Sequence, residues 1–367
     1  MKSISLKAGE LSRPPFEPVV QGAIHALQAG KTHYSPVEGI WDLRLAIADL
    51  YRAHQADIGP ENVLITPGVR QAIFNVLTNT VRPGDEVILP SPYYFSLPSL
   101  IEQAGGKVVI LETKASDNFT ISAKALERLI TPDTRLFIFN NPCNPTGRVY
   151  SPAEIEALAD VLQRHAHVHI LSDEIYEFIT YGKEFRHFGS YQAIADRLIT
   201  TSGFSKAFSM AGFRIGWLVA NERSLQQFKA YQEVTLSGVS MFTQYAAREA
   251  LKTRNEYLPP LVEELRLKRD NGLRILNSIP GLNCPEPEGA FYYFPDVSSF
   301  FGKTAPNGRR IHSAAELTAY LNSICKVQVF CGDLFGMPLN LRLSFSGQAD
   351  DLYEALNRLK TALAELR

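Results

Sequence analysis

Chemically capable side chains recur just after the apolar, strand-like runs in the middle of this sequence. Asp173 follows VHILS, Lys206 stands in a Ser- and Gly-rich turn after RLITTS, and Arg214 comes eight residues later. Ligands of open α/β sheets bind beyond the carboxyl ends of the strands. A lone lysine is usually a solvated charge, but this combination is not what a packed core needs, so we interpret these strand ends as a candidate site.

More polar and aromatic residues follow the neighbouring strand-like runs. They are Gly68, Val69 and Arg70 after ENVLIT, Tyr93 and Tyr94 after EVILP, Asn144 after RLFIFN, and Tyr176 close behind Asp173. Taken alone, Asn144 is typical of a turn because NP dipeptides mark turns, and Asp173 is typical of a strand end or helix cap. Their occurrence at successive strand ends favours a shared ligand site.

Seven ordered segments resemble signature segments of the class I/II aminotransferases, enzymes of fold type I that use pyridoxal 5'-phosphate. They are YSPVEGIWDLR (34–44), TPGVRQAI (66–73), RPGDEVILPSPYY (82–94), NPCNPTG (141–147), SDEIYE (172–177), SGFSKAFSMAGFRIGW (202–217) and NLRLSFS (340–346). The resemblance extends from about Gly9 to the C-terminal helix. It is strongest with bacterial-type aspartate aminotransferases and their prephenate-using relatives, and it implies an aminotransferase (EC 2.6.1.-) with a ping-pong cycle.

The resemblance implies catalytic roles for three residues. Lys206 would form the Schiff base with the cofactor and move the Cα proton of the substrate. Asp173 would keep the ring nitrogen protonated, since a buried carboxylate raises the pKa of a pyridinium beside it. Tyr176 and Asn144 resemble residues that donate hydrogen bonds to the phenolic oxygen of the cofactor, where they stabilise the oxyanion.

The phosphate of the cofactor needs backbone amides and a cation. The 68–70 segment opens a helix directly after a strand, so its free N–H groups and the positive end of the helix dipole suit an anion. Arg214 resembles the phosphate-binding arginine of the family, and an arginine fork matches phosphate geometry. Ser205 adds a hydroxyl, whereas Gly203 stands where many relatives have a phosphate-binding serine.

Two tyrosines complete the implied cofactor site. Tyr94 occupies the family position that stacks on the face of the ring, where an aromatic side chain excludes water. Tyr34 resembles a tyrosine that reaches the phosphate of the neighbouring subunit, although taken alone it reads as a surface residue. This residue implies a homodimer with shared active sites.

The substrate contacts implied by the resemblance are Asn144, in the middle of the chain, and residues near its two ends. Arg342 is expected to bind the α-carboxylate, because Leu339, Leu341 and Leu343 alternate with it and turn it away from the core. Gly9 resembles the loop that closes over the same group.

The contact for the distal carboxylate of a dicarboxylic substrate departs from the family pattern. Pro15 stands where relatives with acidic substrates often have a threonine. Arg13 and Arg70 are the two residues that could substitute for it, because Arg70 lies where some relatives have a lysine for this carboxylate. Aspartate or glutamate with 2-oxoglutarate is the favoured pair, and aromatic or neutral amino acids are the alternative.

Two other functions remain possible at this stage. A C–S β-lyase would use the same cofactor contacts. A ligand-sensing regulatory protein would need a DNA-binding domain ahead of Gly9, and only eight residues precede it. A dinucleotide-dependent dehydrogenase is not supported, because no G-x-G-x-x-G follows a strand.

Composition agrees with a cytoplasmic enzyme. The net charge of −1 over 367 residues argues against nucleic-acid binding, which usually needs a basic excess. The four cysteines form no CxxC and no metal-ligand spacing, so we expect reduced thiols and no metal. The N-terminus lacks the apolar stretch of a signal peptide, and no apolar run is long enough to cross a membrane.

The elements that must position these residues alternate strand with helix. Strands are predicted at 61–66, 86–90, 107–112, 135–140, 168–174, 197–202 and 214–220, and helices at 71–81 and 151–166. This order predicts an α/β fold with a mostly parallel sheet flanked by helices.

The last hundred residues read as a smaller α+β domain. Strands are predicted at 289–295, 326–330 and 339–346, and helices at 261–279, 315–324 and 351–366. We predict three parts: residues 1–30 as an N-terminal segment packing with the small domain, 31–265 as the large cofactor-binding domain, and 266–367 as the small domain.

Overall fold

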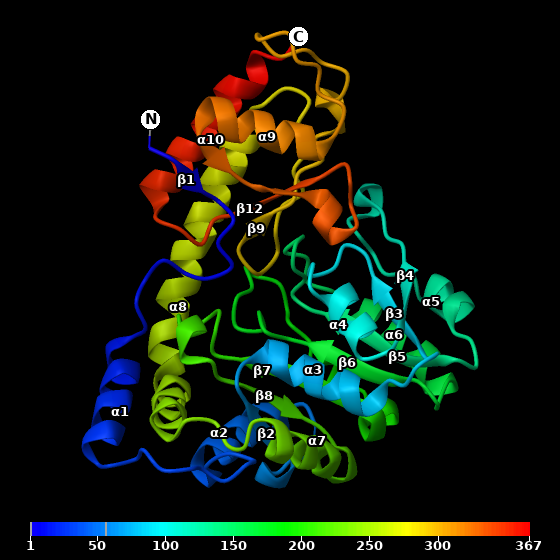
Figure 1. The fold of residues 1–367 in the computed structure, drawn as a ribbon, viewed down its shortest axis with the longest axis vertical. Coiled ribbons are helices and arrows are strands. Elements are labelled where there is room, and N and C mark those ends of the chain that lie inside the picture. Colours follow the sequence, from blue (N-terminus) through cyan, green and yellow to red (C-terminus); the bar gives the residue numbers. More distant parts are fainter. Residues whose placement is uncertain (1, 56) are drawn as a thin grey trace.

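The structure is a computed structural model that describes residues 2–55 and 57–367 (Figure 1). Its α-helices are α1 Glu17–Gln28, α2 Trp41–Arg52, α3 Val69–Thr80, α4 Leu97–Gln103, α5 Ala123–Leu129, α6 Pro152–Arg164, α7 Glu222–Thr235, α8 Met241–Asn277, α9 Ala314–Cys325 and α10 Ala349–Ala364. Its strands are β1 Ile4–Ser5, β2 Val63–Thr66, β3 Glu86–Pro90, β4 Lys107–Leu111, β5 Thr134–Asn140, β6 His169–Asp173, β7 Leu198–Gly203, β8 Gly216–Val219, β9 Tyr292–Tyr293, β10 Val327–Gln328, β11 Phe330–Cys331 and β12 Leu341–Ser344.

A mostly parallel sheet forms the centre of the molecule. Within the described residues its strand order is β2-β8-β7-β6-β5-β3-β4, and β8 alone runs antiparallel to its neighbours. β5 pairs with β6 so that Asn140 lies opposite Asp173. The carboxyl ends of β5, β6 and β7 therefore meet at one edge of the sheet, as the strand pattern predicted.

Helices cover both faces of this sheet. Along β3, Val87 and Leu89 belong to one apolar cluster and Ile88 to another, because successive strand residues point to opposite faces. The first cluster includes buried side chains of α2, α3 and α8, and the second includes those of α5 and α6. The near-continuous apolar strands are explained by this double coverage, and the predicted α/β class is confirmed.

Local sequence signals account for the helix starts. Ser151 caps α6, and the carboxylate of Glu154 accepts a hydrogen bond from the backbone N–H of Ser151, which completes a capping box with Pro152 in the first turn. α3 begins at Val69, two residues before the predicted start. Gly68 precedes it with φ of +91°, a conformation that favours glycine and lets the helix begin directly after β2.

The C-terminal third differs from its prediction in detail. The predicted strand at 289–295 is reduced to β9, and the one at 326–330 is split into β10 and β11. The helix predicted at 261–279 is the second half of α8, which begins at Met241 and contains Pro259 and Pro260. Figure 1 shows α8 running from the sheet toward α10, with α1 along its first half.

The N-terminal strand β1 pairs in parallel with β10 of the C-terminal third. This pairing brings the first residues of the chain beside elements that come some 320 residues later. The division of the chain at residues 30 and 265 stays a prediction. Among the described residues, no helix is long and apolar enough to span a bilayer.

Candidate active site

A cavity of about 370 Å³ opens at the carboxyl edge of the sheet. Its lining residues are Val69, Arg70, Ile73, Tyr94, Leu100, Asn140, Asn144, Asp173, Ile175, Tyr176, Ser205, Lys206, Ala211 and Arg214. Residues separated by more than 140 positions in the chain thus meet because their strands end side by side. Most of the cofactor residues expected from the sequence lie in this one cavity.

Lys206 lines the cavity and is partly buried. Its ammonium donates a hydrogen bond to the carbonyl oxygen of Gly9, and it stands 5.8 Å from the ring centroid of Tyr176. Burial lowers the pKa of Lys206 to about 8, with the nearby charge of Arg342 adding to the effect and Asp173 opposing it. A sizeable fraction of the amine is therefore neutral near physiological pH and able to act as a nucleophile or base.

Asp173 ends β6 and is buried at the floor of the cavity. One carboxylate oxygen accepts a hydrogen bond from the backbone N–H of Ile175 at 3.3 Å. Burial raises the pKa of Asp173 to about 7, and Lys206 only partly counters this. A cation close to this buried carboxyl group would stabilise its charged form, and a protonated ring nitrogen would be such a cation.

Asn140, which the sequence analysis did not single out, holds this end of the sheet together. Its amide nitrogen donates to the Asp173 carbonyl at 2.9 Å, and its carbonyl oxygen accepts from the backbone N–H of Asn144 at 2.7 Å. Asn140 is the last residue of β5, so its position at a strand end was the available signal.

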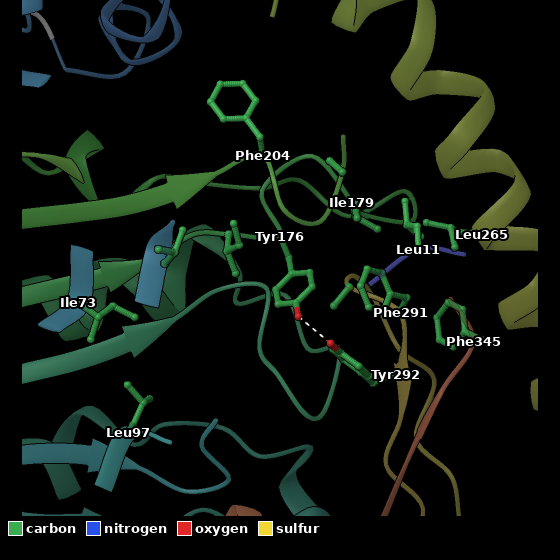
Figure 2. Packing of buried hydrophobic residues seen from close by; sticks show 14 of the residues in the cluster. Leu11, Ile73, Leu97, Tyr176, Ile179, Phe204, Leu265, Phe291, Tyr292 and Phe345 are labelled. Atoms are coloured by element: carbon green, nitrogen blue, oxygen red, sulfur yellow. Dashed lines mark hydrogen bonds between the residues drawn. The ribbon is translucent and has the colours of Figure 1, made fainter. Parts of the chain in front are cut away.

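Tyr292 is a second residue that the sequence analysis missed. The hydroxyl groups of Tyr176 and Tyr292 lie 2.8 Å apart, as Figure 2 shows. Tyr292 belongs to β9, in the aromatic run GAFYYFP, where the sequence alone does not distinguish a core residue from a site residue. Only the packing of β9 against the turn after β6 reveals the pair.

Arg342 is 2% exposed and lies between aromatic rings. Its guanidinium carbon stands 4.4 Å from the ring centroid of Tyr292 and 4.9 Å from those of Phe330 and Phe335. It donates to the side-chain oxygen of Asn144 at 3.1 Å and to the carbonyl of Lys7 at 3.0 Å. Its Nε is buried without a partner, so donor capacity remains for a ligand.

Leu339 departs from the alternating pattern predicted around Arg342. Leu339 was expected on the core side of the alternating pattern, but it is 46% exposed, because β12 begins only at Leu341. Leu341 and Leu343 are buried as expected. Arg342 itself does not line the cavity but contacts Asn144, which does.

The start of α3 and Arg214 form a cationic corner of the cavity. A Cβ atom at Gly68 would lie 2.7 Å from Arg214 Nη2, so the guanidinium packs directly on this glycine. Arg214 is fixed by hydrogen bonds to the carbonyls of Ala211 at 2.7 Å and Pro67 at 3.4 Å. Free N–H groups of α3 and the guanidinium together suit a phosphate.

Gly203 explains one departure from the family pattern. A Cβ atom there would lie 2.9 Å from Gly216 Cα and 3.0 Å from a methyl group of Val69. The strand pair β7–β8 thus leaves no room for a serine side chain at this position. Ser205, buried two residues later, remains the hydroxyl that lines the cavity.

The two arginines proposed for a distal carboxylate lie in different places. Arg70 lines the cavity and donates a hydrogen bond to the hydroxyl of Tyr94. Arg13 forms an ion pair with Glu264 at 3.2 Å and stacks on Tyr257, lining a separate surface groove. The geometry brings Arg70, and not Arg13, to the cavity.

Tyr34 lies outside the cavity and is 92% exposed. A second cavity of about 720 Å³ adjoins the first and shares Arg214 with it. Pro15, Pro67 and the 236–240 segment also line this second cavity. The cationic corner is therefore open on the side of this second cavity.

The residues present fit pyridoxal 5'-phosphate. A partly buried lysine of lowered pKa, a buried carboxylate of raised pKa, and an arginine beside a helix N-terminus line one cavity. These groups match the aldehyde, the ring nitrogen and the phosphate of one cofactor. The fold and the site define the class of pyridoxal-phosphate enzymes with a mostly parallel central sheet.

Comparison with known proteins identifies the family within that class. The family model described as aminotransferase class I and II matches residues 2–359, and the chain belongs to this family. It is therefore a pyridoxal-phosphate-dependent aminotransferase that transfers an amino group between an amino acid and a 2-oxo acid by the ping-pong mechanism general to the family.

Curated relatives and solved structures agree. A probable aspartate/prephenate aminotransferase of Rhizobium leguminosarum bv. phaseoli is 36% identical over 361 residues, covering 97% of this chain and 90% of the relative. The crystal structure of a Rhizobium meliloti aspartate aminotransferase, 34% identical, superposes with a TM-score of 0.96 over 100% of this chain and 92% of its own. A Thermus thermophilus aspartate aminotransferase structure with maleate is 33% identical, with a TM-score of 0.90 over 98% and 91% of the two chains.

Proposed function

We propose that this aminotransferase takes aspartate or glutamate as amino donor and 2-oxoglutarate as acceptor. The observation that carries the proposal is Arg70, a cation in the first turn of α3 that lines the cavity beside Tyr94. An arginine fork binds a carboxylate with two parallel hydrogen bonds. The names of the relatives include aspartate and prephenate, and the Thermus structure was solved with maleate, a dicarboxylate.

In this proposal the residues of the cavity bind the cofactor and transfer the proton. Bound pyridoxal phosphate supplies an electron sink that stabilises negative charge at the substrate Cα. With the cofactor bound, Asp173 would hold a proton at the ring nitrogen, and Tyr176 and Asn144 would donate hydrogen bonds to the phenolic oxygen. Tyr94 would pack against the ring. The phosphate would be held by Gly68, Val69, Ser205 and Arg214, and the neutral amine of Lys206 would carry the Cα proton.

The α-carboxylate is assigned to Arg342, with Gly9 closing over it. The free Nε and the aromatic walls around the guanidinium support this, because they hold the arginine in one orientation and exclude water. The pairing of Arg342 with Asn144 links the substrate end of the cavity to the cofactor end.

Replacing Arg70 tests the substrate assignment. Arg70→Ala should raise KM for aspartate and 2-oxoglutarate by about 10- to 100-fold, since one charge-assisted hydrogen bond contributes about 1.5–3 kcal/mol. Steady-state kinetics should show little change with neutral or aromatic amino acids. Arg13→Ala is the matched control and should leave all these values unchanged. An equal rise in KM for every amino donor would contradict the proposal. Release of pyruvate from cysteine or its thioethers, the C–S β-lyase reaction, would also contradict it.

We also propose a cytoplasmic homodimer with shared active sites. The exposure of Tyr34 and the second cavity beside Arg214 support it, because a partner's tyrosine could enter there and reach the phosphate. Light scattering should give twice the chain mass. Tyr34→Phe should leave the dimer intact and weaken pyridoxal phosphate binding by about tenfold. This is the loss in affinity expected when one hydrogen bond to a charged group is removed. A monomer that binds the cofactor fully would contradict this.

A further inference from the structure

A buried group of two glutamates and one histidine lies behind the turn that carries Asp173 and Tyr176. Glu174 is 1% exposed, and Glu177 and His187 are also buried. His187 Nδ1 lies 2.6 Å from Glu174 Oε2, and His187 Nε2 lies 3.8 Å from Glu177 Oε2. The imidazole thus has a carboxylate at each of its two nitrogens.

The same three side chains are close enough to be considered as ligands of one metal ion. The orientation of the ring argues against this, because a metal binds one imidazole nitrogen and the carboxylates of Glu174 and Glu177 lie at opposite nitrogens. Glu174 also accepts hydrogen bonds from Ser172 at 2.8 Å and from the backbone of Phe188 at 3.3 Å. If both ring nitrogens carry a proton, each N–H points toward one of the two carboxylates.

The spacing of the turn couples this group to the active site. Asp173 and Tyr176 are three residues apart and line the cavity, whereas Glu174 and Glu177, also three apart, contact His187 on the other side. The backbone of Glu174 donates to Thr201 at 2.8 Å, and that of Glu177 donates to Glu174 at 2.8 Å. A shift of either glutamate would therefore move a residue that faces the cofactor.

The surroundings of His187 favour its charged form. Burial alone lowers the pKa of His187, but the charge and hydrogen bond of Glu174 outweigh burial, so that the pKa is raised. Glu177 adds to the rise and Arg186 opposes it. The remaining titratable neighbours are Tyr51 of α2 and His54, whose rings lie 5.3 and 4.6 Å from the ring of His187.

We propose that His187 is a buried imidazolium that holds Glu174 and Glu177 in place and thereby positions Asp173 and Tyr176 for the cofactor. His187 and the two glutamates are positioning residues, since none of them lines the cavity. The link to the cofactor rests on the proposed site, but the charge of His187 does not. The two parts are tested separately.

The charge is tested by NMR on wild-type protein with ¹⁵N-labelled histidine. The resonances of His187, identified by their loss in His187→Gln, should show both ring nitrogens protonated at pH 7.5. Glu174→Gln should lower the pKa of His187. A neutral His187 at pH 7.5 in the wild type would overturn the proposal, and this result needs no variant to bind cofactor.

The coupling is tested by titrating apoprotein with pyridoxal phosphate across the pH range. His187→Gln should bind about tenfold more weakly at pH 7, as expected when a supporting partner of a site residue is lost. His25→Gln should match the wild type. The ratio of the affinities of wild type and His187→Gln should approach one above the pH at which NMR shows His187 to lose its proton.

A purely space-filling role would instead give a ratio that does not vary with pH, and that result would overturn the coupling. If His187→Gln does not fold, Glu177→Gln serves in its place, because it removes the partner at the other ring nitrogen. Failure of the wild type itself to bind pyridoxal phosphate would count against the proposed function, not against the charge of His187.

Discussion

At the scale of single residues, the amine of Lys206 has the most direct consequence for chemistry. Its pKa is lowered to about 8 by burial and by Arg342, so the ammonium loses its proton within the physiological range. The rate at which apoprotein forms its covalent link with pyridoxal phosphate should rise with pH to a midpoint near 8, because only the neutral amine attacks the aldehyde. Stopped-flow absorbance would measure this.

Arg342→Gln provides the internal check, since it removes the second cause of the lowered pKa. Its midpoint should move to higher pH, whereas Arg13→Gln, on the far surface groove, should leave it in place. A wild-type midpoint near the ordinary lysine value of 10.5 would contradict the environment described for Lys206.

Residue identity was predictable where a local motif carries the chemistry. Lys206, Asp173, Asn144 and Arg214 stand in short segments with fixed neighbours, and all four line the cavity. Tyr292 was not predictable, because its partner Tyr176 lies 116 residues away and the aromatic run around it fits a core equally well. Contacts made by packing of distant elements leave no mark in the local pattern.

At the scale of elements, the contact between β7, β8 and the start of α3 depends on glycine. A Cβ atom at Gly216 would lie 2.9 Å from the backbone nitrogen of Val69 and 3.0 Å from the carbonyl oxygen of Ser202. Gly216→Ala should lower the free energy of unfolding by about 1–3 kcal/mol, the usual cost of overpacking. It should also weaken cofactor binding, since the first turn of α3 must move.

Urea unfolding and pyridoxal phosphate titration would test this, with Gly347→Ala as control. A Cβ atom at Gly347 meets no atom within 4 Å, so that variant should behave as wild type. If Gly216→Ala and Gly347→Ala had the same free energy of unfolding and the same affinity for pyridoxal phosphate, the contact between β7, β8 and α3 would not be tightly packed at Gly216.

Element boundaries show where sequence patterns reach their limit. The parallel strands β3 to β7 were predicted to within two residues, because apolar runs buried on both faces have a strong signature. β9 to β11 were not, because strands of two residues are defined by their partners more than by their own residues. Leu339, expected in a strand, lies just before β12, and the helix expected from residue 261 begins at Met241.

At the scale of the whole molecule, buried carboxyl groups make the stability of the apoprotein depend on pH. Burial raises the pKa of Asp173 and of Glu177 to about 7, from ordinary values of 3.8 and 4.5. Between about pH 4 and 7 the folded state therefore binds more protons at these two groups than the unfolded state does, and their contribution to stability falls as pH rises. The lowered pKa of His169, about 4, opposes only one of the two below pH 6.5. His187 acts in the same direction, since its raised pKa contributes stability at low pH that is lost at higher pH.

The free energy of unfolding of the apoprotein, measured in urea at pH 5, 6, 7 and 8, should accordingly decrease. Asp173→Asn should flatten this decrease, because the amide has no proton to lose. Pyridoxal phosphate should flatten it too, since a cation beside Asp173 lowers the pKa of that carboxyl. Stability that rises between pH 5 and 7 would contradict the burial of these carboxyl groups. A slope that Asp173→Asn changes but the cofactor does not would show that the ring nitrogen does not meet Asp173.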